Sequence, residues 1–165
     1  MSNPDRINYK KPITSDFSDG FYDWSIFLVN LYLRVQQILK IDFESFMILQ
    51  IVVGYHVNNL NKTGSTSISQ LTFRFEEIVN RKAIRIPKLT VTSISSALNI
   101  PRETVKRKID HLIKEKYLSL NPNKSITLGA NYHKVFQSFA LETTYDLGMV
   151  MSRWSRKGYI EKLMN

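Results

Sequence analysis

Residues 89–128 read LTVTSISSALNIPRETVKRKIDHLIKEKYLSLNPNKSITL, and this stretch decides the fold. Its first part predicts a short helix over Val91–Leu98, because Thr90 is a favourable N-cap and apolar residues recur at helical spacing. Asn99–Ile100 then forms a turn, where Asn tolerates left-handed backbone geometry. The residues of this helix expected to face inward are Ile94, Ala97 and Leu98, and the small Ala97 allows a second helix to cross closely.

The second helix is predicted from Pro101 to about Lys116. Proline suits the first helical position, where a missing N–H costs nothing. One apolar stripe follows at three- and four-residue steps, formed by Val105, Ile109, Leu112 and Ile113. The opposite, exposed face carries Arg102, Glu103, Lys106, Arg107 and Asp110, with Thr104 near its start. These residue types can read base edges: Arg and Lys donate to guanine, Glu accepts from cytosine, and Thr offers a hydroxyl or a methyl.

The third part of the stretch predicts a β-hairpin. Two alternating runs, Tyr117–Leu120 and Ser125–Leu128, flank the turn residues Asn121–Lys124, whose Asn and Pro content is typical of turns. Two short helices joined by a tight turn, the second longer and basic, are what helix-turn-helix docking in the major groove requires. The sequence therefore predicts a mainly α fold: a winged helix-turn-helix with a small β-hairpin wing, flanked by N- and C-terminal helices.

Positive charge is concentrated around this stretch. The chain has 165 residues and a formal net charge of +9, with 23 Lys and Arg against 14 Asp and Glu. Between Arg81 and Lys124 there are 11 basic residues and 3 acidic ones, so nearly all the excess lies in one quarter of the chain. A concentrated basic segment attracts polyanions, because each neutralised phosphate releases condensed counterions. A solvated basic face without such a partner is the alternative.

The stretch resembles the winged helix-turn-helix of MarR-like transcriptional regulators, and its motif is also similar to the segment found in GntR-like ones. The matching positions, without a gap over about 30 residues, are Leu89, Thr90, Val91, Ile94, Leu98, Ile100, Arg102, Thr104, Val105, Arg107, Ile109, Leu112 and Leu118. Three positions depart from the family pattern: Asn99 replaces the turn glycine, Pro101 replaces the capping serine, and Lys116 replaces the glycine after the second helix. In a left-handed position Lys116 costs about 1 kcal/mol relative to glycine.

The resemblance implies a homodimer, formed by the first helix and the C-terminal helices. It also implies a small lipophilic effector bound among aromatic and methionine side chains, for which the candidates are Trp24, Phe27, Phe43, Phe46, Met47 and Tyr55. The alternatives are that the terminal helices complete a monomeric core and that these side chains form an ordinary core.

Around the central stretch the chain is predicted to have four parts: a flexible arm (1–20), an N-terminal helical layer (21–80), the winged module (81–130) and a C-terminal dimerisation segment (131–165). In the N-terminal layer we expect a helix over Phe21–Leu39, capped by Asp19, with an apolar seam of Trp24, Leu28, Leu31, Val35 and Ile38. A buried helix is expected over residues 43–60, capped by Asp42. A third helix is expected over residues 69–80, or a short strand at Phe73–Phe75. Glycines 148 and 158 are expected to break the C-terminal helices.

Several classes of function are disfavoured. The chain has no cysteine, so it has no disulfide framework and no thiol chemistry, and it fits a reducing, cytoplasmic location. The three histidines, His56, His111 and His133, are scattered without metal-ligand spacing. Neither a Gly-rich phosphate loop nor a stretch able to cross a bilayer occurs. We therefore expect neither an enzyme nor a cofactor, and no membrane partner.

The sequence thus predicts a cytoplasmic regulator of transcription that binds double-stranded DNA. Base edges and nearby phosphates are assigned to Arg102, Thr104, Lys106 and Arg107, together with Glu103. The DNA backbone is assigned to Lys88, Lys108, Asn123 and Lys124. The rival interpretations are a winged-helix protein–protein scaffold, a non-specific nucleic-acid binder, and a protein that binds RNA or a replication origin.

Overall fold

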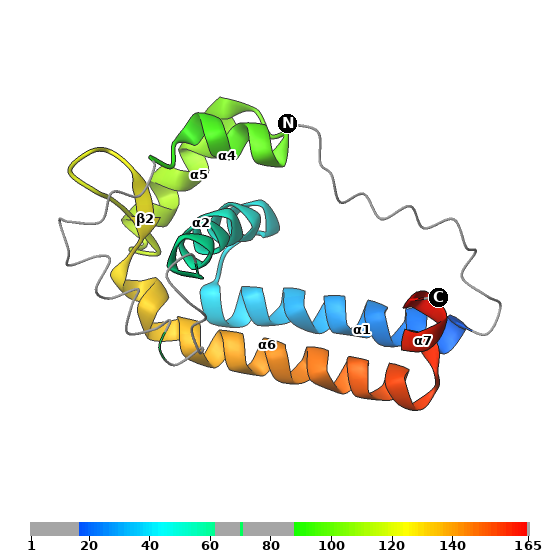
Figure 1. The fold of residues 1–165 in the computed structure, drawn as a ribbon. Helices are drawn as coiled ribbons and strands as arrows, with labels where there is room; N and C mark the ends of the chain where they lie inside the picture. The colour runs from blue at the N-terminus through cyan, green and yellow to red at the C-terminus, as the bar shows by residue number, and fades with distance from the viewer. Residues whose placement is uncertain (1–16, 62–69, 71–87, 165) are drawn as a thin grey trace. The chain divides into compact units, whose positions relative to one another are not determined.

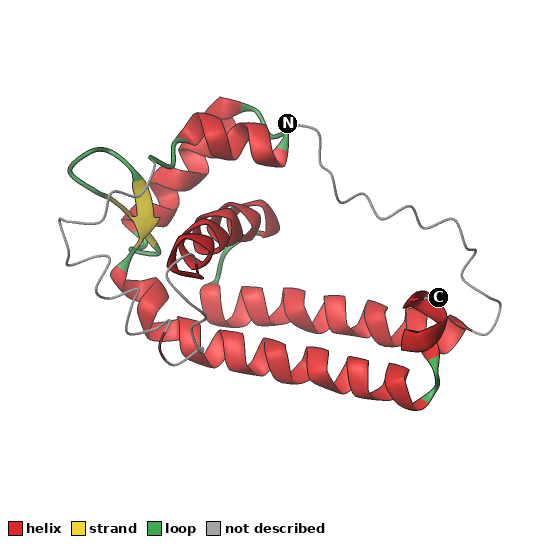
Figure 2. Cartoon of the chain, viewed as in Figure 1, coloured by secondary structure: helices red, strands yellow, loops and turns green. Residues whose placement is uncertain are grey.

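A computed structural model of the chain describes residues 17–61, 70 and 88–164 (Figure 1). Across these residues the structure is mainly α-helical, with one small two-stranded antiparallel sheet (Figure 2). The helix expected over residues 69–80, its alternative strand, and residues 1–16 of the predicted arm lie outside the described part, apart from Gln70, which is helical. The chain divides into two compact units, which we call the central unit (residues 31–143) and the terminal unit (residues 1–30 and 144–165).

The first helix, α1, spans Ser18–Arg34 and continues as a π-helix, η2, over Val35–Leu39. Lys40, in left-handed geometry with φ 53°, ends η2. The helix begins three residues before the predicted start, so Asp19 lies in the first turn and does not cap it. The predicted seam is also only partly right, because Trp24 and Leu28 are 39% and 43% exposed.

Helix α2 spans Phe43–Asn61 and forms the middle of the central unit's core. Its start is fixed as predicted: Asp42 Oδ1 accepts a hydrogen bond from the backbone N–H of Ser45 at 2.8 Å. Because few polar residues interrupt this helix, it is buried on several sides. Its fully buried residues include Ile48, Leu49 and Val52.

Helices α4 (Val91–Leu98) and α5 (Arg102–Lys114) are joined by a tight turn. Thr90 caps α4 reciprocally with Ser93: Ser93 N donates to Thr90 Oγ1 at 3.2 Å, and Thr90 N donates to Ser93 Oγ at 2.9 Å. Asn99 adopts the predicted left-handed geometry, with φ 53°. Two details of the prediction are wrong: α5 starts at Arg102, one residue late, because Pro101 is its N-cap, and the side chain of Ala97 is exposed rather than inward.

The hairpin consists of β1 (Leu118–Leu120) and β2 (Ile126–Leu128), paired antiparallel with Ser119 opposite Thr127. It lies within the predicted runs. Lys116 has φ 59°, so the chain leaves α5 through a left-handed residue, as expected at this position. The side chains of β2 are all buried, which joins the hairpin to the core.

Helix α6 spans Ala130–Arg156, and α7 spans Tyr159–Met164. The predicted break at Gly148 is wrong, since α6 runs through it, whereas Gly158, with φ 68°, does separate the two helices. Just before α6, Gly129 lies against the carbonyl oxygens of Lys116 and Leu118, where a Cβ atom would overlap both. None of the described helices combines the length and the apolar content needed to cross a membrane.

The terminal unit contains α1 up to Asn30, α6 from Thr144 onward, and α7. Two ion pairs join α1 to the C-terminal part of the chain: Asp23 to Arg153 at 3.0 Å, and Asp19 to Lys157 at 2.7 Å. The earlier residue of α1 pairs with the later residue of the C-terminal part, so α1 and the end of α6 run antiparallel and side by side (Figure 1). Phe17 packs edge-on against Trp154 at 5.2 Å between ring centroids.

Candidate functional site

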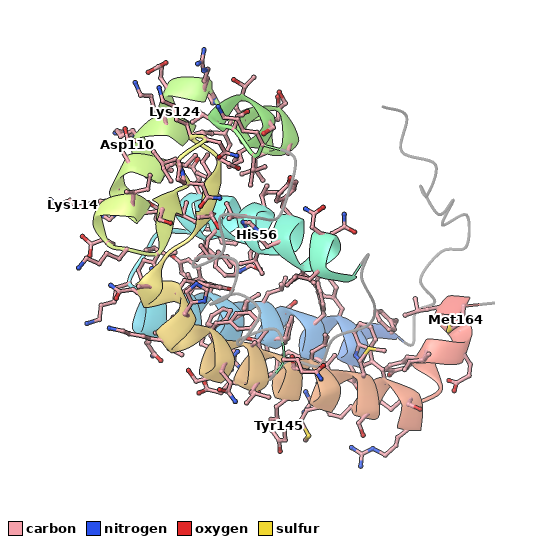
Figure 3. All side chains as sticks on the ribbon, turned by 60° about the vertical axis from the view of Figure 1, so that its left-hand side comes forward. His56, Asp110, Lys114, Lys124, Tyr145 and Met164 are labelled. Atoms are coloured by element: carbon pink, nitrogen blue, oxygen red, sulfur yellow. The ribbon has the colours of Figure 1, made fainter. Side chains whose placement is uncertain are left out.

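The exposed face of α5 gathers basic side chains. Arg102, Lys106, Arg107 and Lys114 are all exposed, and none of them forms an ion pair with another described residue. The other exposed residues of this helix are Glu103, Asp110 and His111, so the face has four positive and two negative side chains and no apolar one. Asp110 and Lys114 point away from the ribbon into solvent (Figure 3).

The apolar stripe of α5 fixes which side of the helix is presented. Val105, Ile109 and Leu112 are 0%, 2% and 0% exposed, and they belong to the core formed with α2, α4 and the hairpin. A helix turns by about 100° per residue, so burial of this stripe turns the remaining positions outward. The core therefore holds the basic face of α5 in one orientation.

Two members of this face were missed by the sequence prediction. His111 and Lys114 lie four and seven residues after Arg107, so they share its side of the helix. The signal was present in the sequence, because the same helical spacing that selected Arg107 also selects these two positions. Lys114 adds a fourth cation to the face.

The structure brings Lys88 and Lys124 to neighbouring points, although they are far apart in the sequence. Leu89 N donates to Ser125 Oγ at 3.0 Å, and Ile126 N donates to Leu89 O at 3.0 Å. Lys88 and Lys124 directly precede two of these bonded residues, and both are exposed. A second pair of cations thus stands at the hairpin turn, beside the chain segment that enters α4.

Asn123 contributes to the fold of the hairpin turn, and Thr104 is only half-exposed. Asn123 Oδ1 accepts a hydrogen bond from Ser125 N at 2.9 Å, which shapes the hairpin turn. Lys124, with φ 60°, completes this turn by donating its N–H to Asn121 O at 2.7 Å. Thr104 is half-buried on the flank of α5, next to the exposed Glu103.

Lys108 does not join the exposed face. Its side chain is 14% exposed, and its Nζ lies 2.8 Å from Asp42 Oδ2 and 3.1 Å from Glu44 Oε2, at the start of α2. Partial burial tends to raise the pKa of Asp42, but hydrogen bonds from Lys108 and Ser45 outweigh it and lower that pKa. Partial burial likewise tends to lower the pKa of Lys108, and its bonds to the two carboxylates outweigh it and raise that pKa. The Lys108 ammonium and the Asp42 carboxylate are therefore charged together near neutral pH.

The exposed cations of α5 and of the hairpin turn suit an anionic partner. In the described part of the chain, no group of three or more His, Asp or Glu side chains is placed to hold a metal ion. The aromatic residues considered for an effector are divided: Phe46 packs edge-on against Phe139 in the central unit, whereas Trp24 stacks on Phe27 in the terminal unit. Comparisons of the chain with models of protein families, with curated proteins and with solved structures find no match.

Proposed function

We propose that this protein binds duplex DNA with sequence preference, using residues 89–128 as a winged helix-turn-helix with α5 in the major groove. Arg102, Lys106 and Arg107 contact base edges and adjacent phosphates, together with Glu103 and Thr104. Lys88, Asn123 and Lys124 hold the DNA backbone next to the hairpin. Phosphate contacts position such a protein, and base contacts supply its preference.

The proposal depends chiefly on one observation, the exposed face of α5. Its four cations have no ionic partner among the described residues, whereas Arg34, Lys108, Arg153 and Lys157 each pair with a carboxylate. Cations left without partners on one side of a helix are available to phosphates and to guanine edges. The helix itself has the width that a major groove admits.

The main rival is a scaffold in which α5 binds another protein. Such a role favours apolar side chains at the centre of the contact surface. The exposed residues of α5 are all charged or polar, which favours a nucleic acid.

The experiment is selection of random-sequence duplexes by the full chain at about physiological salt, followed by sequencing of the retained DNA. We expect a palindromic motif with half-sites roughly one helical turn apart. Salt-sensitive retention without a motif would contradict sequence preference and support a non-specific binder. Preferential retention of single-stranded or duplex RNA in a parallel selection would contradict the assignment to DNA.

We further propose that the protein acts as a homodimer through the terminal unit. Every exposed residue of α1 from Phe21 to Asn30 is apolar or Asn, and the exposed residues of α6 from Thr144 to Ser152 include no charge. The large apolar side chains among them are Phe21, Tyr22, Trp24, Ile26, Leu28, Val29, Tyr145, Leu147, Met149 and Met151, at 39–69% exposure. Large exposed apolar surfaces of this kind mark interaction sites.

A second copy of the chain is the partner that fits. The described charges of the terminal unit balance, with four basic and four acidic residues, so these residues supply no net charge that would favour an anionic membrane or an acidic partner. An uncharged face can meet its own copy across a two-fold axis without like-charge repulsion.

Sedimentation equilibrium tests the dimer without DNA. Wild type is expected at twice the monomer mass, and Val29→Lys is expected to be monomeric because it places a charge in the apolar face. Ser138→Lys, at an exposed position of α6 in the central unit, is the matched control and should remain dimeric. A monomeric wild type would contradict this part of the proposal and leave the DNA-binding part standing.

A further inference from the structure

One cation of α5 stands apart from the others. Lys106 and Lys108 are two residues apart on the same helix, yet Lys106 is exposed and Lys108 has a side chain only 14% exposed. Lys108 Nζ donates to both carboxylate oxygens of Asp42, at 2.9 and 2.8 Å, and lies 3.1 Å from Glu44. Among the described residues, its ammonium contacts all lead to the start of α2 and none to solvent-facing groups of α5.

The ion cluster joins the two helices at a defined point. Asp42 also caps α2 through Ser45, so Lys108 is bonded to a residue whose own position is fixed by the helix that it begins. Next to Lys108, Ile109 is buried in the core that contains α2. Packing and ion pairing therefore act on the same turn of α5, and together they set how α5 rotates and tilts on α2.

We infer that Lys108 is a positioning residue and makes no phosphate contact, and that Asp42 and Glu44 withhold it from DNA and so limit non-specific binding. The inference rests on the proposed function. One ammonium faces two carboxylates, so the cluster has a net charge of −1 and repels a phosphate that approaches this flank of α5. Only the unpaired cations of α5 are then available to DNA, which makes affinity depend more on base contacts.

The test measures the affinity of the full chain for a random-sequence duplex as a function of salt, because the slope of log affinity against log salt reports phosphate contacts, at about 0.9 per contact. The matched variants are Lys108→Met and Lys106→Met, which remove the same charge from positions two residues apart. The third variant is Asp42→Asn/Glu44→Gln, in which both carboxylates become neutral while Asn retains the helix cap. Thermal unfolding confirms that each variant is folded.

We expect the magnitude of the slope to fall by about 0.9 in Lys106→Met and to stay at the wild-type value in Lys108→Met. In Asp42→Asn/Glu44→Gln we expect the magnitude of the slope to rise by about 0.9. The affinity of this variant should therefore fall by about 3.5-fold more than that of wild type when the salt is raised from about 50 to 200 mM. We also expect the random duplex to bind at least about 3-fold more tightly at the lower salt, because Lys108 is released to a phosphate.

Each of the other outcomes refutes either one part of the inference or the proposed function. Equal falls of slope in Lys106→Met and Lys108→Met would show that Lys108 contacts phosphate and would overturn the inference alone. Unchanged binding by Asp42→Asn/Glu44→Gln would overturn the restraining role of the carboxylates. Loss of all duplex binding by wild type would refute the proposed function, and with it any DNA role for either lysine.

Discussion

The buried imidazole of His56 makes the stability of this protein depend on pH in a calculable way. His56 lies on α2 and is 3% exposed, in edge-on contact with the ring of Tyr55 at 5.5 Å. Burial removes hydration from the charged form and lowers the pKa of His56 from 6.5 to about 4. The backbone of Ile126 in β2 opposes this shift, and the nearby His133 adds to it.

The sign and size of the effect follow from proton linkage. Between about pH 6.5 and about pH 4 the unfolded chain binds the proton and the folded chain does not, so stability falls as the pH falls through this window. The stabilising contribution is complete above the window, and no more is lost below it. From about pH 7.5 to about pH 4.5, the two pKa values give a loss of about 2.5 kcal/mol in the free energy of unfolding.

Urea unfolding of wild type and His56→Leu at these two pH values measures the effect. Leucine keeps an apolar side chain in the core and cannot titrate, so contributions from all other groups cancel in the comparison. Wild type is expected to lose about 2.5 kcal/mol more than the variant as the pH is lowered. Parallel losses in the two proteins would refute the reasoning, because they would show that His56 binds its proton equally well folded and unfolded.

Three further predictions concern substitutions at five positions. Gly129→Ala should lower the free energy of unfolding, measured by urea titration, by about 1–3 kcal/mol, because the added Cβ overlaps backbone oxygens. Gly148→Ala should raise it by about 0.5–1 kcal/mol, because this position of α6 has open space for a Cβ atom. Lys116→Gly should stabilise by about 1 kcal/mol, since φ is 59° at this position, and an unchanged melting temperature would contradict that. Arg107→Ala should weaken binding to the selected duplex by about 1–3 kcal/mol and relax preference at one base, whereas Lys124→Ala should weaken all sequences alike; equal effects on all sequences from both would contradict base reading by Arg107.

Local signals in the sequence predicted the elements of residues 89–128 closely. The bounds of α4, the left-handed Asn99 and Lys116, and the hairpin depend on caps, turn residues and periodicity, all of which act within a few residues. Gly148 shows where such signals fail, because helix propensity is a weak preference that a long helix overrides. The seam of α1 failed for another reason: this helix is apolar around much of its circumference, and the sequence does not say which side meets α6.

In the candidate site, too, the sequence predicted what local signals determine and missed what depends on contacts between distant residues. The exposed positions of α5 followed from its apolar stripe, and a complete helical projection would have added Lys114. The environment of Lys108 could not be predicted, because Asp42 lies 66 residues earlier in the chain and nothing local links the two. The closeness of Lys88 to Lys124 likewise depends on bonds between Leu89 and the hairpin, which form only in the folded chain.

The hydrogen bonds at Leu89 have a consequence for how the length of the surrounding chain can vary. Ile126 N donates to Leu89 O, so the strand that ends the α4–α5–hairpin segment is fastened to the residue that begins it. The entrance and the exit of the segment therefore coincide, as they do in modules that tolerate insertion into other chains. Changes in the length of the chain before Leu89 or after Leu128 can therefore leave the hydrogen bonds within this segment intact, but the orientation of α5 is kept only while α2 continues to pack against it.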